Sequence, residues 1–206
     1  MPVVLVANPK GGVGKSTLAT NIAGYLASRG HAVMLGDIDR QQSSRLWLGL
    51  RPPEAREIKT WEASEDGDVV RPPRGTTHAV IDTPAGLHGA RFKDVVALAD
   101  KVLVPLQPSI FDIYATRDFL DKLLSHRRVD KTHVAVVGMR VDARTLAAER
   151  LREFVAGLDV TVLGEVRDTQ NYVQLAARGL TLFDIAPGRV QRDLEQWEPI
   201  CRWLDE

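Results

Sequence analysis

A glycine-rich run near the start of the chain contains the residue types that hold a triphosphate. It reads Lys10-Gly11-Gly12-Val13-Gly14-Lys15-Ser16-Thr17. Glycines permit backbone angles that are closed to other residues, so main-chain N–H groups can surround an anion closely. In such a loop we expect Lys15 to reach the β- and γ-phosphates, the Ser16 hydroxyl to coordinate magnesium, and Thr17 to lie near the α-phosphate. The run therefore predicts a site for ATP with Mg²⁺.

The run departs from the ordinary phosphate-loop pattern G-x-x-x-x-G-K-[ST], because the first glycine of that pattern would fall at Pro9. A dinucleotide-binding turn is an alternative, since Gly12 and Gly14 supply G-x-G and acidic residues follow roughly 20 residues later. The third glycine of that motif would fall at Thr17. A lysine and a hydroxyl directly after the last glycine suit a magnesium triphosphate better than a pyrophosphate bridge.

Acidic residues follow two apolar runs that we expect to be strands. One run ends in Gly36-Asp37-Ile38-Asp39, and the run Ala79-Val80-Ile81 ends in Asp82. Ligands of a doubly wound sheet collect at the carboxyl ends of its strands. We expect Asp82 to support the magnesium ion through a bound water, and Asp39 to orient the attacking water or contact the metal by water. Asp37 is equally suited to a role in this chemistry and to capping or bracing the loop.

The elements that must position these residues alternate along the chain. Short apolar runs predict strands over residues 3–7, 32–36, 79–81, 102–106, 134–137 and 160–163. Helical patterns fall over residues 17–29, 92–98, 114–124, 146–155, 171–177 and 190–204. This alternation predicts an α/β fold with a doubly wound, mainly parallel sheet in one domain spanning residues 1–206. Residues 51–77 interrupt the alternation of strands and helices, and we expect them to form a surface excursion with one edge strand near Ile58.

Composition limits the class of protein. The chain has 206 residues with 27 Lys and Arg against 27 Asp and Glu, so binding to nucleic acid would need a local basic patch. Its single cysteine, Cys201, cannot form an internal disulfide, a zinc site or an iron–sulfur cluster alone. The first apolar run is too short for a signal peptide or a membrane span. These features predict a cytoplasmic protein.

Three segments together resemble the ParA/MinD family of partition and positioning ATPases, whose phosphate loop is a deviant Walker A motif. They are residues 10–17, 37–43 and 80–86, and weaker similarity continues at residues 105–112, 142–144 and 167–179. The resemblance implies that two ATP-bound subunits form a sandwich, with Lys10 reaching the partner's phosphates and Gly12 where the two loops approach. It also implies catalytic roles for Lys10, Lys15 and Asp39, with Asp39 as the hydrolysis residue.

Two positions depart from the family pattern. Arg40 stands where the family has proline, which removes a fixed φ angle and restores an N–H group beside Asp39. Where family members often carry asparagine after the fifth strand, this chain has Gly138-Met139-Arg140. We expect Met139 or the segment at Pro108 to contact the adenine base.

The branches of this family differ in what their nucleotide-bound form binds. MinD-like members end in a basic amphipathic helix, but the apolar stripe within residues 190–204 is flanked mainly by acids, so we expect this helix to pack on the core. ParA-like members bind DNA without sequence preference through basic side chains. The candidates for phosphate contacts here are Arg127, Arg128, Lys131, Arg152, Arg167, Arg178, Arg189 and Arg192.

The function predicted from the sequence is a ParA-like ATPase that dimerises with ATP, binds non-specific DNA and associates with the nucleoid when ATP-bound. A ParB-like or other basic activator protein would stimulate hydrolysis, and we expect no membrane association. An alternative is a metabolic ATP-dependent ligase of the dethiobiotin synthetase-like type, which shares this fold and loop. A nucleotide-dependent adaptor that does not hydrolyse ATP is a further alternative, and the presence of Asp39 argues against it.

Overall fold

A computed structural model describes residues 1–65, 68–125 and 132–206. Its main sheet has six strands in the order β2-β5-β1-β6-β7-β8, and every pairing between neighbours is parallel. The strands are β1 (Val3–Val6), β2 (Val33–Asp37), β5 (His78–Asp82), β6 (Lys101–Leu106), β7 (His133–Val141) and β8 (Thr161–Arg167). The helices are α1 (Lys15–Ser28), α2 (Ser43–Gly49), α3 (Gly89–Leu98), α4 (Ile110–Leu124), α5 (Leu146–Ala156), α6 (Gln170–Ala176) and α7 (Gln191–Asp205).

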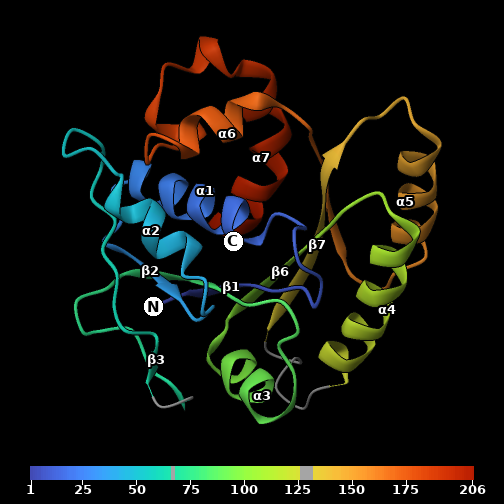
Figure 1. The fold of residues 1–206 in the computed structure, drawn as a ribbon, viewed down its shortest axis with the longest axis horizontal. Helices are drawn as coiled ribbons and strands as arrows, with labels where there is room; N and C mark the ends of the chain where they lie inside the picture. The colour runs from blue at the N-terminus through green and yellow to red at the C-terminus, as the bar shows by residue number, and fades with distance from the viewer. Residues whose placement is uncertain (66–67, 126–131) are drawn as a thin grey trace.

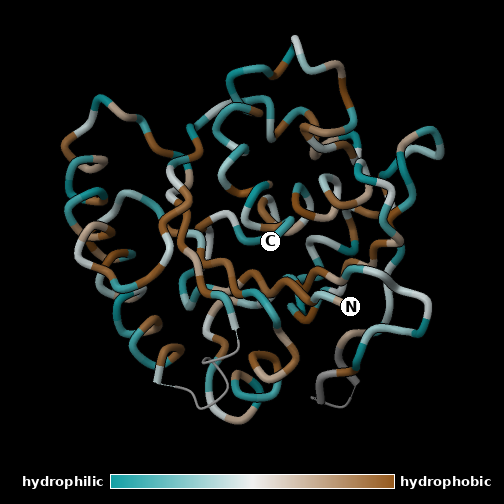
Figure 2. The backbone as a smooth tube through the Cα atoms, turned by 180° about the vertical axis from the view of Figure 1, so that it is seen from behind, coloured by the Kyte–Doolittle hydropathy of each residue, from teal (hydrophilic) through white to brown (hydrophobic). Residues whose placement is uncertain are grey.

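Helices cover both faces of this sheet (Figure 1). One face packs against α1, α2, α6 and α7, and the other against α3, α4 and α5. Strand β1 is apolar throughout because it is buried on both faces of the sheet. Val4 and Val6 belong to the first core, and Val3 and Leu5 to the second. In Figure 2 the strands form a hydrophobic centre beneath a more hydrophilic surface. The predicted doubly wound α/β fold is confirmed, and the sheet is wholly parallel.

The excursion predicted over residues 51–77 lies along the outer edge of β2. Lys59 forms an isolated parallel bridge with Met34, where the edge strand near Ile58 was expected. A small antiparallel hairpin, β3 (Ser64–Glu65) and β4 (Asp68–Val69), forms a second sheet within the excursion. At the opposite edge, β8 pairs with β7 through two register shifts, and Gly164 has a φ of 95°. Neither outer strand therefore presents a straight, open edge.

Close packing between α1 and the segment after α6 gives a test of the fold. A Cβ atom added at Gly24 would lie 2.6 Å from Thr181 Cγ2, and Thr181 is buried. We expect Gly24→Ala to lower the melting temperature, because overpacking costs about 1–3 kcal/mol. Alanine gains only about 1 kcal/mol over glycine in helix propensity.

The matched control is Gly49→Ala in α2, where an added Cβ meets nothing within 4 Å. This variant should melt at or slightly above the wild-type temperature, as measured by circular dichroism. Equal effects of the two substitutions would contradict the packing argument.

Candidate nucleotide site

The predicted phosphate loop joins the end of β1 to the start of α1, a buried strand followed directly by a helix N-terminus. Gly12 and Gly14 have φ angles of 76° and 96°, in the left-handed region that favours glycine. An added Cβ at Gly12 meets nothing within 4 Å, so the loop is open on that side. The start of α1 directs free N–H groups toward the loop, as phosphate binding requires.

Lys15 is buried at the first position of α1, and its Nζ donates a hydrogen bond to the Lys10 carbonyl at 2.7 Å. Burial lowers the pKa of Lys15, while the carboxylates of Asp82 and Asp39 oppose that shift by favouring the charged ammonium. The three predicted residues therefore lie within electrostatic reach of one another. A cation beside two carboxylates in a glycine loop is the arrangement expected for a magnesium triphosphate.

Two acidic residues lie side by side at the carboxyl ends of neighbouring strands. Asp37 on β2 is the register partner of Asp82 on β5. Asp37 accepts hydrogen bonds from the backbone N–H groups of Asp39 at 2.9 Å, Ser44 at 2.8 Å and Arg45 at 3.3 Å. It therefore braces the loop and the start of α2, which is one of the two roles open to it from the sequence. Burial raises the pKa of Asp37, and these hydrogen bonds oppose the shift.

Asp82 is only 1% exposed, and its Oδ2 accepts a hydrogen bond from Ser44 Oγ at 2.6 Å. Its Oδ1 is buried without a hydrogen-bond partner among the described residues. Burial raises the pKa of Asp82 to about 6, against the nearby hydroxyls of Ser44 and Ser16 and the charge of Lys15. An unsatisfied carboxylate oxygen near a serine hydroxyl fits the donor set that Mg²⁺ prefers. Ser16 and Asp82 are thus suited to hold the ion, Asp82 through a water.

The loop that carries Asp39 is half-buried and is organised by its own acidic residues. Asp39 Oδ1 accepts a hydrogen bond from the Gln41 backbone N–H at 3.0 Å, and Gln42 ends the turn with a φ of 49°. Arg40, which replaces the family's proline, is exposed. The role of Asp39 in hydrolysis stays a prediction, and its place beside Lys15 is compatible with it.

Lys10 lies apart from the other loop cation. Its side chain is 41% exposed, and its Nζ lies 3.8 Å from Asp112 Oδ1 in the first turn of α4. An ion pair this exposed contributes at most about 1 kcal/mol, so Lys10 can leave it at small cost. The geometry therefore leaves Lys10 available at the surface while Lys15 stays inside.

Two side chains that the sequence did not single out brace the loop. Asn8 is buried, and it accepts the Lys10 backbone N–H at 2.8 Å and donates to Thr116 Oγ1 at 2.9 Å. Gln107 Nε2 donates to the Gly12 carbonyl at 2.9 Å. These bonds tie the loop to β6 and α4. The sequence shows a polar residue just before the loop and another just after β6. Their hydrogen-bond partners lie about a hundred residues away along the chain, so the sequence does not show that these residues brace the loop.

The two residues proposed to contact the base come from different segments, Met139 from β7 and Pro108 from the turn after β6. Met139 is buried, and its Cε would lie 3.1 Å from a Cβ atom added at Gly14, so it supports the loop from beneath. Pro108 is half-buried between β6 and α4. A contact of either residue with adenine stays a prediction.

The predicted DNA-contacting arginines differ in their surroundings. Arg152 pairs with Glu165 through two hydrogen bonds at 2.7 and 2.8 Å, and Arg167 pairs with the fully buried Asp193. The remaining described candidates are exposed: Arg178, Arg189 and Arg192. The candidates Arg127, Arg128 and Lys131 lie outside the described residues.

The apolar stripe of α7 packs on the core, as predicted. Trp197 and Leu204 are buried there, and Cys201 packs against them. Within the described part of the chain, no helix combines the length and hydrophobicity that crossing a membrane requires.

The raised pKa of Asp82 predicts a pH-dependent stability. A shift from 3.8 to about 6 means that ionised Asp82 costs the nucleotide-free protein about 3 kcal/mol. The carboxyl is charged above pH 6, so it destabilises the folded protein most in that range. The destabilisation decreases as the pH falls through 6 toward 4. We therefore expect Asp82→Asn to raise the melting temperature at pH 7.5 and to have roughly half that effect at pH 5.

The control for this measurement is Asp94→Asn on the exposed side of α3, which should have little effect at either pH. A gain for Asp82→Asn of equal size at both pH values would show that the ionised carboxylate is not its cause.

Comparisons with known proteins agree with this geometry. Residues 4–182 match the family described as CbiA, the CobQ/CobB/MinD/ParA nucleotide binding domain. Maintenance of carboxysome distribution protein A from Halothiobacillus neapolitanus is 29% identical over 195 residues, which cover 91% of this chain and 90% of that protein.

Solved structures share the fold at low sequence identity. The MinD cell division protein of Aquifex aeolicus has a TM-score of 0.75 at 20% identity, over 99% of this chain and 96% of its own. Apo McdA from Cyanothece has a TM-score of 0.74 at 15% identity, over 97% of this chain and 99% of its own. The family match over most of the chain confirms the resemblance seen in the sequence. The chain belongs to the CobQ/CobB/MinD/ParA nucleotide-binding family and, within it, to the ParA/MinD P-loop ATPases.

Proposed function

We propose that residues 1–206 form one ParA-like ATPase domain that binds Mg-ATP and pairs with a second copy across the nucleotides. The ATP-bound dimer binds DNA without sequence preference, and a ParB-like or other basic activator stimulates hydrolysis to ADP and phosphate. The cycle positions or segregates a cargo, either DNA or a protein assembly. We place the protein in the cytoplasm, on the nucleoid when ATP-bound. The carboxysome-distribution function in the name of one relative supports a positioning role.

The observation that carries this proposal is the separation of the two loop lysines. Lys15 is buried beside Asp39 and Asp82, where it serves the nucleotide of its own chain. Lys10 is half-exposed and paired only weakly with Asp112. A cation supplied across a dimer interface would offset the charge that develops on the γ-phosphoryl group. The second lysine is therefore suited to act on a partner.

In this scheme each residue of the site has a separate task. The N–H groups of Gly11 to Gly14 and the Lys15 ammonium bind the phosphates, and Ser16 with Asp82 holds the magnesium ion. The ion supplies charge neutralisation on the β- and γ-phosphates when bound. Asp39 orients the attacking water, and Thr17 binds the α-phosphate. Removal of Asp39 should therefore leave ATP binding intact and prevent turnover.

The test uses Asp39→Ala as a background that retains ATP. We expect this variant to bind ATP without hydrolysing it and to form dimers with ATP, measured by light scattering after size exclusion. Adding Lys10→Ala should weaken dimerisation at least tenfold, while binding of a fluorescent ATP analogue changes little. The matched control is Lys93→Ala, an exposed lysine on α3.

Undiminished dimerisation of the Lys10→Ala variant would refute the role of Lys10 in pairing. Normal turnover by Asp39→Ala would remove that residue from its assigned role. Activity with a small carboxylate or amine substrate, without any response to DNA, would favour the ligase alternative.

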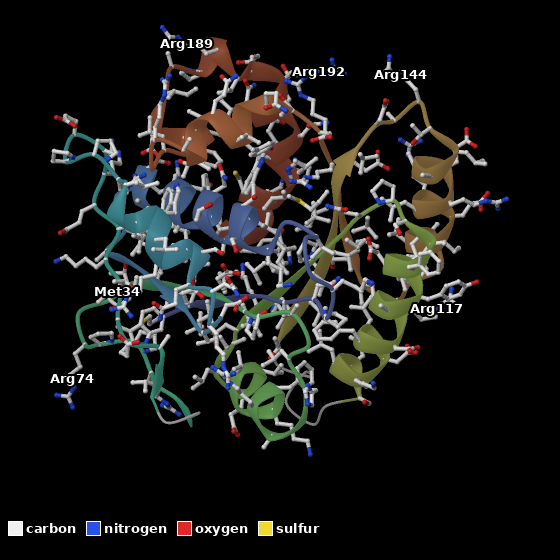
Figure 3. All side chains as sticks on the ribbon, viewed as in Figure 1. Met34, Arg74, Arg117, Arg144, Arg189 and Arg192 are labelled. Atoms are coloured by element: carbon white, nitrogen blue, oxygen red, sulfur yellow. The ribbon has the colours of Figure 1, made fainter. Side chains whose placement is uncertain are left out.

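DNA binding is proposed for the end of the molecule formed by α6 and α7. Figure 3 shows Arg189 and Arg192 extending from this end, whereas Arg74 extends from the lower left of the view, away from α6 and α7. Arg178 is also exposed at the end of α6. Arg152 and Arg167 remain weaker candidates because carboxylates already bind their guanidinium groups.

We expect Arg189→Ala combined with Arg192→Ala to weaken binding to DNA of any sequence. Each lost phosphate contact should reduce the slope of log K against log salt by roughly 0.9. Filter binding across a salt series measures the slope, with Arg74→Ala as the control that should keep the wild-type value. An unchanged slope in the double variant would exclude these two arginines.

A further inference from the structure

A cavity of about 600 Å³ opens where α1 ends and β2 begins. Its walls are formed by residues within 27–34 and by two parts of the excursion, within 56–59 and 74–76. In Figure 1 the excursion runs along the outer side of β2. Ala27 in the cavity wall and Lys15 in the phosphate loop belong to the same helix, and a rise of about 1.5 Å per residue places them about 18 Å apart. The cavity is therefore separate from the nucleotide site.

The rim of the cavity carries an excess of positive charge. Arg56, Lys59 and Arg74 line it, and Glu57 is the only acidic residue among the described residues of the lining. Glu57 already has a partner, because its Oε2 lies 3.4 Å from Lys59 Nζ. In the part of the chain that the structure describes, no ion pair joins Arg56 or Arg74 to a carboxylate. Two exposed guanidinium groups at one opening favour a phosphate or a carboxylate, which each can bind through two hydrogen bonds.

The carboxyl end of α1, which carries partial negative charge, also borders the cavity. Its last carbonyl groups are occupied within the chain: Ala27 accepts the Gly30 N–H at 3.0 Å, and Leu26 accepts the His31 N–H at 3.3 Å. The partial charge of a helix end is about half a unit, against two full guanidinium charges. The charge of the opening therefore stays positive.

The inner wall of the cavity is mainly apolar. Val33 is buried and Met34 is partly buried, and Figure 3 shows Met34 on the same side of the molecule as Arg74. Thr76 also lines the cavity, and its hydroxyl is buried without a hydrogen-bond partner among the described residues. Buried polar groups nearly always have a partner, so an unpaired hydroxyl indicates one from outside the chain. Apolar walls with a few polar groups are typical of small-molecule sites.

We propose that this cavity is a second ligand site, for a small organic anion that joins an aromatic or aliphatic body to a phosphate or carboxylate group. The body would cover Val33 and Met34, and the anionic group would pair with Arg56 and Arg74. The volume lies within the range of about 300–1,000 Å³ that is usual for such sites. DNA could meet the exposed cations, but it would leave the apolar wall uncovered. The wall therefore favours a small anion with an apolar body over a nucleic acid.

The experiment measures binding of 2-naphthyl phosphate by isothermal titration calorimetry, with Mg²⁺ and a non-hydrolysable ATP analogue present to occupy the phosphate loop. Arg56→Glu and, separately, Lys59→Glu should weaken binding at least tenfold. Both side chains are exposed, so the melting temperature should stay at the wild-type value. The matched control is Lys93→Glu, which makes the same change of charge at an exposed position on α3 and should bind like the wild type.

Three further probes separate the parts of the ligand. 2-Naphthol lacks the anionic group and inorganic phosphate lacks the apolar body, so each should bind at least tenfold more weakly than 2-naphthyl phosphate. 2-Naphthoate should also bind, and its affinity relative to that of 2-naphthyl phosphate shows which anionic group the cavity prefers.

Several results would overturn the proposal. They are the absence of binding, equal affinity in the wild type and both cavity variants, and 2-naphthol binding as tightly as 2-naphthyl phosphate. An equal loss in Lys93→Glu would trace the effect to net charge and overturn it too. If Lys59→Glu weakens binding to DNA but leaves binding of the probe unchanged, these cations belong to the DNA-binding surface and the cavity is not their site of action.

Discussion

A buried ammonium group sets the arrangement of the whole site. Lys15 begins α1 almost out of contact with solvent, and burying a charge is costly unless anions or hydrogen-bond acceptors surround it. The fold supplies the Lys10 carbonyl and the carboxylates of Asp82 and Asp39. Those carboxylates can reach it only because parallel strands end at one edge of the sheet. The loop, the ends of the strands and the acidic residues therefore meet in one electrostatic arrangement around Lys15.

The same requirement links the site to α2. Asp82 holds the hydroxyl of Ser44, and Asp37 holds the backbone of Ser44 and Asp39. The segment that carries Asp39 is thus fastened at both ends to the carboxyl edge of the sheet. A change in the charge at Asp82, such as that made by a bound cation, acts directly on the hydrogen bonds that position this segment.

Continuous apolar runs made the six main strands predictable, because strands buried on both faces leave no polar positions. The sequence did not predict helix α2, because it is short and both Leu46 within it and Leu50 directly after it are exposed, so no apolar stripe marks it. The loop residues were predictable from glycine chemistry and spacing. Asn8 and Gln107 were not, because their value comes from partners about a hundred residues away. The pairing of Arg167 with Asp193 is hidden from sequence for the same reason.

The two outer strands of the sheet have a consequence for how copies of the chain can meet. Lys59 and its excursion occupy the outer side of β2, and the irregular register with Gly164 distorts β8. Open strand edges invite chains to join edge to edge and to extend without limit. With the edge of β2 occupied and β8 irregular, growth by strand addition is disfavoured at both edges. In the proposed pairing across the nucleotides, growth would end after one partner is added, which suits a protein that switches between discrete states.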